Sequence, residues 1–171
     1  MEGYVQVYTG DGKGKTTAAF GLALRAAGAG LKVFIAQFVK GGEYNEIKAL
    51  GRFSDFITIK QYGSGCFIRQ SPSEEDKKMA LAGLEEVEKA MLSGDYRMII
   101  LDEVNIATYF SLFTVERLLE FIQKKPAGVE LVMTGRKADP RVVEIADLVT
   151  EMREIKHYYQ KGVEARDGIE R

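Results

Sequence analysis

The sequence contains no tryptophan, one cysteine and one histidine among its 171 residues. The single thiol, Cys66, excludes an internal disulfide bond and a cysteine-rich metal site, so the core alone must hold the fold. The single imidazole, His157, excludes a metal centre built from several histidines. No apolar run approaches the roughly 20 residues that span a bilayer, and the N-terminal residues lack the pattern of a secretory signal. We therefore expect a cytoplasmic protein with no membrane partner.

An excess of charge of either sign is also absent. The chain carries 24 Lys and Arg against 25 Asp and Glu, a formal net charge of −1, which argues against a nonspecific nucleic-acid binder. Any anionic ligand must therefore be bound by a local site. The length and the apolar fraction of 46% are typical of one globular domain, so residues 1–171 are expected to form a single domain.

Short apolar runs recur along the chain, with helical patterns between them. Because these runs lack polar alternation, they are typical of strands buried on both faces of a mainly parallel sheet. The pattern predicts an α/β fold, a three-layer sandwich in which helices cover both faces of about six strands. The expected strands are residues 5–8, 33–38, 56–59, 98–101, 129–133 and 148–150.

The clearest helix is predicted over residues 72–93, where Ser71-Pro72-Ser73-Glu74 resembles a capping box. Thr114 and Asp139 are candidate N-caps of two further helices. The segment from Glu151 onward is rich in charge and is expected to wrap the surface or close a site. The apolar residues expected on the inner face of the long helix are Met79, Leu84, Val87 and Met91.

Residues 9–17 read Thr-Gly-Asp-Gly-Lys-Gly-Lys-Thr-Thr and stand between an expected strand and an expected helix. Glycines let the backbone take positive φ angles and present its N–H groups to phosphate oxygens, with the positive end of the helix behind them. Lys15 would supply a point charge and Thr16 a hydroxyl ligand for Mg²⁺. The spacing is unusual, since three residues separate Gly10 from Gly14 where the common loop has four. The predicted ATP-binding residues are Thr9, Gly10, Asp11, Gly12, Lys13, Gly14, Lys15, Thr16 and Thr17.

Asp102 and Glu103 come directly after the apolar run at residues 98–101. Phosphate-loop proteins place the carboxylate that holds Mg²⁺ at this end of a buried strand, opposite the threonine of the loop. The two motifs together predict a divalent cation, Mg²⁺ or Mn²⁺, at Thr16 and the acidic pair. Glu103 is ambiguous, because it fits a metal ligand and equally the base that activates water in an ATPase.

Other segments that follow expected strands are candidate walls of the same site, because ligands of open parallel sheets lie beyond the carboxyl ends of the strands. Arg136, after an apolar strand and a glycine, is placed to meet a phosphate oxygen. Residues 37–42 and Asn105 occupy similar positions. Residues 63–67 are expected to form a flexible loop whose apolar tip fits a cover for a flat hydrophobic ligand and equally a piece of the core.

In this order the motifs resemble the corrinoid adenosyltransferases, the family that includes the bacterial ATP:cob(I)alamin and cob(I)yrinic acid a,c-diamide adenosyltransferases. The resemblance implies transfer of the 5′-deoxyadenosyl group of ATP to the cobalt of a reduced corrinoid, with release of intact triphosphate, on a RecA-like phosphate-loop fold. Family members share the shortened glycine spacing. The stretches that carry the resemblance are residues 9–21, 37–41, 101–105 and 134–136, with further similarity over residues 146–170.

The resemblance also implies residue roles for the transfer. Cob(I) is itself a strong nucleophile, so the protein must align the cobalt with the ribose 5′ carbon and neutralise charge on the triphosphate. Lys13, Lys15 and Arg136 are the candidate catalytic cations. Glu103 is favoured over Asp102 as the metal ligand by the resemblance.

The corrinoid itself is expected at Cys66, Phe67, Ile68 and Asn105. Better-known members place aromatic residues at the positions matching 66–68, where they help displace the lower axial ligand of cobalt, whereas here only Phe67 is aromatic. The resemblance further implies an unidentified reductase as electron donor and a homodimer as a candidate assembly. Two alternatives stay open: a small phosphate-loop ATPase or kinase with Glu103 as base, and a non-catalytic corrinoid or nucleotide-binding protein.

Overall fold

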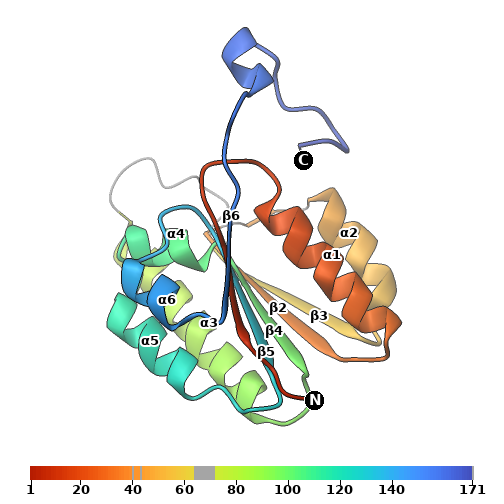
Figure 1. Ribbon diagram of the computed structural model, residues 1–171, viewed down its shortest axis with the longest axis vertical. Coiled ribbons are helices and arrows are strands. Elements are labelled where there is room, and N and C mark those ends of the chain that lie inside the picture. Colours follow the sequence, from red (N-terminus) through yellow and green to blue (C-terminus); the bar gives the residue numbers. More distant parts are fainter. Residues whose placement is uncertain (40, 43, 64–71, 171) are drawn as a thin grey trace.

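The computed structural model describes residues 1–39, 41–42, 44–63 and 72–170. Its strands form one six-stranded sheet in the order β3-β2-β4-β5-β1-β6, and all neighbouring strands are parallel (Figure 1). The prediction of a mainly parallel sheet of about six strands is confirmed. The strands are β1 Val5–Thr9, β2 Val33–Phe38, β3 Ile57–Tyr62, β4 Met98–Asp102, β5 Glu130–Thr134 and β6 Leu148–Glu151.

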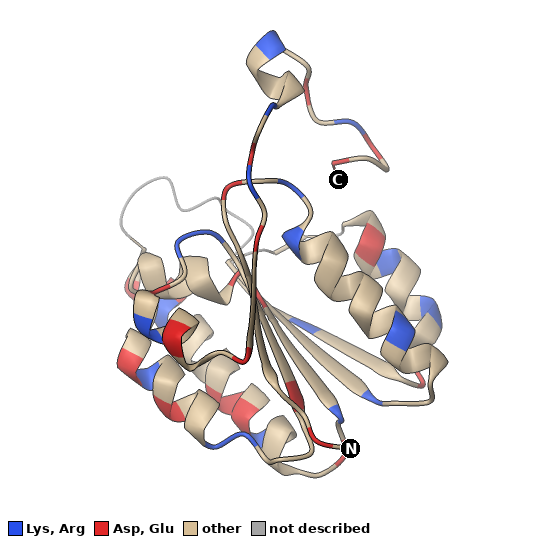
Figure 2. Cartoon of the chain, in the orientation of Figure 1, with Lys and Arg blue, Asp and Glu red and all other residues tan. Residues whose placement is uncertain are grey.

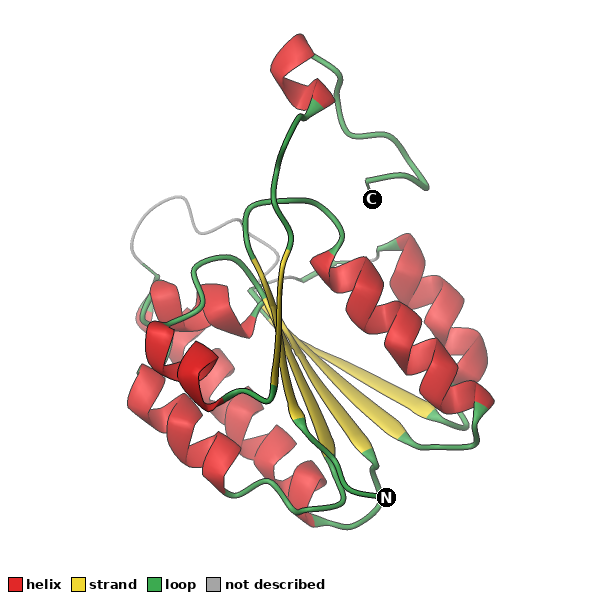
Figure 3. Cartoon of the chain, in the orientation of Figure 1, coloured by secondary structure: helices red, strands yellow, loops and turns green. Residues whose placement is uncertain are grey.

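Helices cover both faces of this sheet and form the outer layers of the predicted sandwich (Figure 3). Successive residues of β2 face opposite layers: Val33 and Ile35 pack in the core cluster beneath α1 and α2, while Phe34 packs in the cluster on the other face. One face carries α1 Lys15–Gly28 and α2 Asn45–Leu50, and the other carries α3 Glu74–Leu92, α4 Val104–Tyr109, α5 Val115–Gln123 and α6 Pro140–Ile145. Short 3₁₀ turns follow at Gly51–Phe53 and Tyr158–Lys161.

The long helix α3 begins two residues later than the sequence predicts. Its capping box is formed by Ser73 and Asp76: Ser73 Oγ accepts from Asp76 N at 3.1 Å, and Ser73 N donates to Asp76 Oδ2 at 3.0 Å. The expected inner residue Met79 is 37% exposed, so that assignment is wrong. The buried face passes instead through Gly83, where a Cβ would come within 2.4 Å of the Tyr62 ring. A pattern of apolar residues does not detect a glycine on the buried face, although the missing side chain is what lets the helix approach the Tyr62 ring.

The predicted caps of the two later helices are confirmed. Thr114 Oγ1 accepts from Arg117 N at 3.2 Å at the start of α5, and Asp139 Oδ1 accepts from Arg141 N at 2.9 Å at the start of α6. The predicted strand at residues 56–59 differs more, since β3 runs on to Tyr62 beside β2. The second half of β3 contains polar residues, so the apolar run that predicted this strand ends before the strand itself does.

The strand order places β5 between β1, which leads into the glycine-rich loop, and β4, which ends at Asp102. All carboxyl ends meet at one edge, and the chain after β6 crosses above it, close to the start of α1 (Figure 1). Acidic and basic residues are interspersed over the outer helices (Figure 2). In the described part of the chain, no helix is both long enough and apolar enough to cross a membrane.

Candidate functional site

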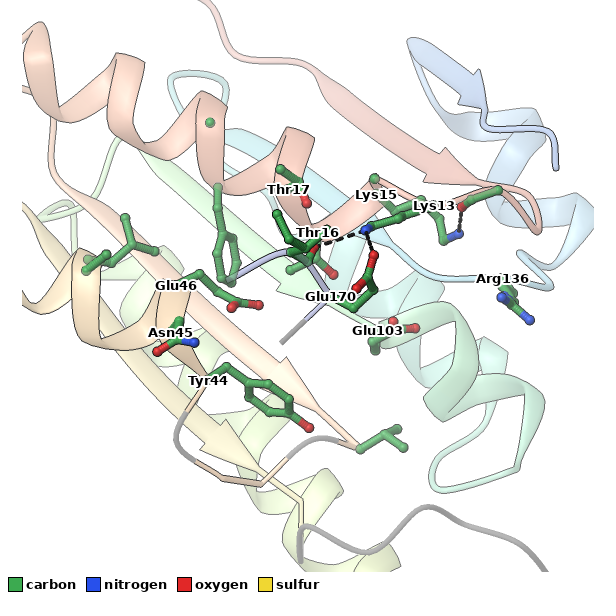
Figure 4. Close-up of a pocket in the computed structure, with 18 of the residues that line it drawn as sticks. Lys13, Lys15, Thr16, Thr17, Tyr44, Asn45, Glu46, Glu103, Arg136 and Glu170 are labelled. Atoms are coloured by element: carbon green, nitrogen blue, oxygen red, sulfur yellow. Dashed lines mark hydrogen bonds and ion pairs between the residues drawn. The ribbon is translucent and has the colours of Figure 1, made fainter. Parts of the chain in front are cut away.

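A cavity of about 990 Å³ opens at the carboxyl edge of the sheet. Residues 11–17 of the glycine-rich loop, Glu103 and Arg136 form its polar wall. The apolar wall comes from α1, α2 and the 3₁₀ turn after α2, with Phe20, Leu24, Leu50 and Phe53 as its large side chains. Residues 157–170, here called the C-terminal cover, supply His157, Gly168 and Ile169 to the wall. They also supply Glu170, which lies beside the loop (Figure 4). The cavity therefore joins a charged region to an apolar one.

The glycines of the loop allow the backbone after β6 to approach closely. Gly12 N donates to Met152 O at 2.7 Å, and Met152 N donates to Thr9 O at 2.8 Å. A Cβ on Gly10 would lie 2.4 Å from Met152 O, and one on Gly12 would lie 2.7 Å from the same oxygen. Gly10 and Gly14 also have φ angles of 93° and 114°, which favour glycine. The structure thus adds close packing to the conformational reason given by the sequence.

Lys15 places its ammonium group inside the loop. Its Nζ donates to Gly10 O and to Gly12 O, both at 2.7 Å, and the residue is only 8% exposed. It is also the first residue of α1, where the backbone N–H groups of the helix point at the loop. Positive potential from the side chain and from the helix therefore acts on the same small volume.

Asp102 joins the two sequence motifs directly. Its Oδ1 accepts from Thr16 Oγ1 at 2.8 Å and from Thr134 Oγ1 at 2.7 Å, and its Oδ2 accepts from Gln37 Nε2 at 2.9 Å. The side chain is fully buried, so these donors replace the water that a carboxylate otherwise requires. The sequence predicted that Thr16 and Asp102 lie opposite each other at one site, and it placed residues 37–42 and 134–136 at its walls, but it did not predict that Gln37 and Thr134 donate to this carboxylate.

Glu103 turns away from its neighbour Asp102 and lines the cavity. The turn depends on a φ of 59°, uncommon outside glycine, and Glu103 N donates to Thr134 Oγ1 at 3.0 Å. Thr16 and Glu103 line the same cavity, Asp102 is hydrogen-bonded to Thr16, and all three carry hard oxygen atoms of the kind that Mg²⁺ prefers. Among the residues that the structure describes, no three carboxylate, imidazole or thiolate side chains gather into a metal site. Such a cation would need further oxygens from a phosphate or from water.

The two remaining predicted cations lie at the rim. Arg136 is 55% exposed in its side chain, and its Nε lies 3.9 Å from Asp11 Oδ1. Lys13 points towards the C-terminal cover, where its Nζ donates to Glu170 Oε1 at 2.9 Å and to Ile169 O at 3.0 Å. The hydrogen bond to Glu170 raises the pKa of Lys13 above its ordinary value. Lys13 therefore holds the cover to the loop in this structure.

Glu170 is the centre of the cover and was missed by the sequence analysis. It accepts hydrogen bonds from Arg166 and Tyr158 as well as from Lys13, and the first of these is the main reason that its pKa lies below the usual value. A second link runs from Asn45 Nδ2 on α2 to Asp167 Oδ1 at 2.7 Å. The expectation that the charged C-terminal segment closes a site agrees with these contacts.

The sequence profile of the family described as ATP:corrinoid adenosyltransferase BtuR/CobO/CobP matches residues 1–171. The chain belongs to this family. The corrinoid adenosyltransferase of Pseudomonas aeruginosa is 36% identical over 169 residues, which cover 98% of this chain and 83% of that protein. The corrinoid adenosyltransferase of Escherichia coli K12 is 31% identical over 172 residues, covering 98% and 85%.

Membership of the corrinoid adenosyltransferase family confirms the resemblance, in which the corrinoid is expected at residues 66–68 and Asn105. Cys66, Phe67 and Ile68 lie outside the described residues. Asn105 is 1% exposed and donates from Nδ2 to Gly135 O at 3.1 Å, while its Oδ1 has no hydrogen-bond partner among the described residues. Of the described residues around it, Glu103 and Ile106 line the cavity and Asn105 does not. In this structure Asn105 fixes α4 to the turn that leads to Arg136.

Proposed function

We propose that this protein transfers the 5′-deoxyadenosyl group of ATP to the cobalt of a reduced corrinoid and releases triphosphate. Membership of the corrinoid adenosyltransferase family supports this activity. The structural observation that carries it is that Lys15 and Thr16, with buried Asp102 behind Thr16, lie at one end of a cavity that continues into an apolar region. A triphosphate fits the first part, and a flat apolar ligand meets the second.

The transfer is a displacement at carbon. The electron pair of cob(I) forms a bond to the ribose 5′ carbon, the bond from that carbon to the phosphate oxygen breaks, and the oxygen leaves with the bonding electrons. No proton moves at the reacting carbon, so the chain needs no general base. Its task is to stabilise the leaving triphosphate and to hold the two reactants in line.

Lys15 and Arg136 are assigned to the charge of the triphosphate. Lys15 lies within the loop, and Arg136 stands at the rim after β5, so the two approach a bound anion from different sides. Lys13 is assigned to the same anion once its contact with Glu170 is released, because its ammonium group also borders the cavity. Backbone N–H groups of the loop and of the start of α1 complete the phosphate site, apart from that of Gly12, which donates to Met152 O.

The residues present fit a Mg²⁺ or Mn²⁺ ion, which would neutralise charge on the phosphate oxygens when bound. We assign Glu103 and the Thr16 hydroxyl to this ion, because Glu103 faces the cavity and Thr16 stands at the start of α1. Asp102 is assigned to holding Thr16 in place through their hydrogen bond of 2.8 Å. This division follows from the burial of Asp102 and the partial exposure of Glu103.

The position of the corrinoid, its electron donor, the assembly, the domain organisation and the location of the protein also belong to this proposal. The corrinoid is proposed to contact residues 66–68, with buried Asn105 acting from behind the cavity wall, and an unidentified reductase is proposed to supply the electron that makes cob(I). A homodimer, a single domain over residues 1–171 and a cytoplasmic location are retained as predictions.

The test is product analysis with purified protein, ATP, Mg²⁺ and a chemically reduced corrinoid. We expect triphosphate and a light-sensitive adenosylated corrinoid in equal amounts, measured by chromatography and by the absorption spectrum of the corrinoid. Formation of ADP and phosphate alone would sink the proposal in favour of an ATPase or kinase with Glu103 as base. Binding of both ligands without a cobalt–carbon bond would indicate a binding protein instead.

A further inference from the structure

A row of polar side chains crosses the carboxyl edge of the sheet from the site to the edge strand β3. The strand register pairs Gln37 of β2 with Asp102 of β4 on one side and with Gln61 of β3 on the other. Gln37 Nε2 donates to Asp102 Oδ2 at 2.9 Å, and Gln61 Nε2 donates to Gln37 Oε1 at 3.0 Å. Three neighbouring strands are thus linked through side chains as well as through their backbones.

The carboxylate of Asp102 fixes the direction of the whole row. Because an ionised carboxylate only accepts hydrogen bonds, Gln37 must turn its amide nitrogen towards Asp102 and its oxygen towards Gln61. Gln37 is fully buried in a strand whose other residues are all buried, and both ends of its amide are satisfied. Reversing the amide would set two acceptors face to face at Asp102 and two donors face to face at Gln61.

The row ends on the backbone of the loop after β2. Gln61 Nε2 also donates to Gly42 O at 3.0 Å, and Gly42 N donates to Gln61 Oε1 at 3.4 Å. In the same loop Val39 has a φ of 66°, a left-handed conformation that is rare for a β-branched residue, and it lines the cavity. Such a conformation persists where the surroundings hold it. Buried Phe38 holds the chain before Val39, and Gln61 holds it afterwards at Gly42.

We propose that Gln61 is a positioning residue, which acts through Gln37 on Asp102 and through Gly42 on the cavity wall at Val39. The same row of hydrogen bonds then fixes the position of the Asp102 carboxylate, which holds Thr16, and the position of the cavity wall at Val39, on the other side of β4. Occupation of the site by a nucleotide with its cation is thereby coupled to the conformation of this wall. The coupling rests on the proposed function, since it requires a nucleotide and a divalent cation in the cavity.

The deciding variant is Gln61→Met, which keeps the length of the side chain and removes its hydrogen bonds. Binding of ATP to the full chain is measured by calorimetry with Mg²⁺ and again without it. We expect the affinity for Mg-ATP to fall about fivefold, as for the net loss of one hydrogen bond, and the affinity for ATP without metal to change by less than about twofold. A merely structural role would weaken both to the same extent. Equal weakening with and without metal, or wild-type affinity for Mg-ATP, would overturn the proposal.

Thr58→Val is the matched control on the same strand. Its hydroxyl lies 3.1 Å from Tyr96 Oη, so the substitution also removes a hydrogen bond, but not one in the row. We expect this control to bind Mg-ATP like the wild type. A fivefold loss in Thr58→Val as well would show that β3 responds to any lost hydrogen bond and would overturn the assignment to Gln61.

A double-mutant cycle adds an independent arm. Gln37→Leu breaks the row next to Asp102 but leaves the contacts of Gln61 with Gly42, so Gln61→Met should weaken Mg-ATP binding less in this background than on its own, whereas fully additive losses would contradict the row. If Gln37→Leu does not fold, the metal dependence of Gln61→Met still decides. The proposed function can fail without the row failing. A protein that binds Mg-ATP but forms no adenosylated corrinoid would contradict the transfer, while its Mg-ATP affinities would still test the row.

Discussion

The sheet side of the cavity and the C-terminal cover hold their charged groups in different ways. On the sheet side, Lys15 and Asp102 are buried and are fixed by several donors and acceptors on neighbouring strands and the loop. On the cover, Lys13 and Arg166 keep 45% and 53% of their side chains exposed while they contact Glu170. Buried hydrogen bonds to charged groups contribute about 1.5–3 kcal/mol, whereas exposed ion pairs contribute about 0–1 kcal/mol. We therefore expect the contacts of the sheet side to stay formed and the contacts between the cover and the loop to break more easily.

The strongest test of the sheet side is Lys15→Ala. Two carbonyl groups of the loop hold the Lys15 ammonium group in place, and the substitution removes this positive charge. We therefore expect kcat/KM for adenosyl transfer to fall at least about a thousandfold. Calorimetry should show a parallel loss of ATP affinity. Lys32→Ala, an exposed lysine just before β2, is the matched control and should behave like the wild type. Full activity of Lys15→Ala would contradict the role of the loop.

The second test replaces Asp102 by asparagine, which has the same shape but no charge. If the new amide nitrogen faces Gln37 Nε2, two donors meet; if it faces Thr16 and Thr134, both hydroxyls must turn round to accept, so the buried hydrogen bonds are weakened in either orientation and the charge is lost. We expect a loss of about 3 kcal/mol in the free energy of unfolding, measured by urea denaturation. Asp55→Asn, at an exposed position, is the control and should change stability by less than about 0.5 kcal/mol. A similarly small change at Asp102 would show that the sheet side is less tightly built than the contacts indicate.

The sequence predicted the sheet side far better than the cover, and the reason is physical. Asp102 ends β4, whose residues are all buried, and burial on both faces produces the uninterrupted apolar run that predicts this strand. The loop follows β1, in which Val5 and Val7 are buried and the residues between and after them are partly exposed. Register and strand order then bring the two motifs together. The contact between Lys13 and Glu170 joins residues 157 positions apart. Neither residue belongs to a periodic element, so no local pattern reports their pairing.

The short elements around the site were missed for a related reason. Helices α2 and α4 are each six residues long, too short for a helical apolar period to be recognised. The start of α4 also depends on the left-handed conformation of Glu103, which residue type alone does not predict. In contrast, the caps at Thr114 and Asp139 were found because a cap is a local chemical feature.

Arg136→Ala tests the rim between the two sides. Its side chain is about half exposed and its contact with Asp11 is long, at 3.9 Å, so stability should change by less than about 0.5 kcal/mol. We expect kcat to fall about tenfold, since one charge that stabilises the leaving triphosphate is lost. Steady-state kinetics measure this, and Arg136→Lys should recover part of the loss because the charge is kept. A drop in stability without a drop in kcat would place Arg136 with the structural residues of the sheet side.

The smallest effect is expected at the cover and is best seen through pH. Hydrogen bonds from Arg166 and Tyr158, with a further one from Lys13, lower the pKa of Glu170 in the folded protein. A carboxyl group with a depressed folded pKa contributes its full stabilisation above the unfolded value and loses it as the pH falls through the folded value. The cover should therefore stay attached at pH values where an ordinary glutamate, with a pKa of about 4.3, is already half protonated. Amide exchange at Arg166 N, which donates to Glu170 Oε2 at 2.8 Å, reports attachment directly.

In Glu170→Gln the protection should be weak at every pH while kcat changes by less than about threefold, since exposed contacts contribute little. If wild-type protection were half lost near pH 4.3, Glu170 would be an ordinary surface carboxylate and the cover would have no defined attachment. If Glu170→Gln instead lowered kcat as strongly as Lys15→Ala, the cover would belong to the permanent part of the site.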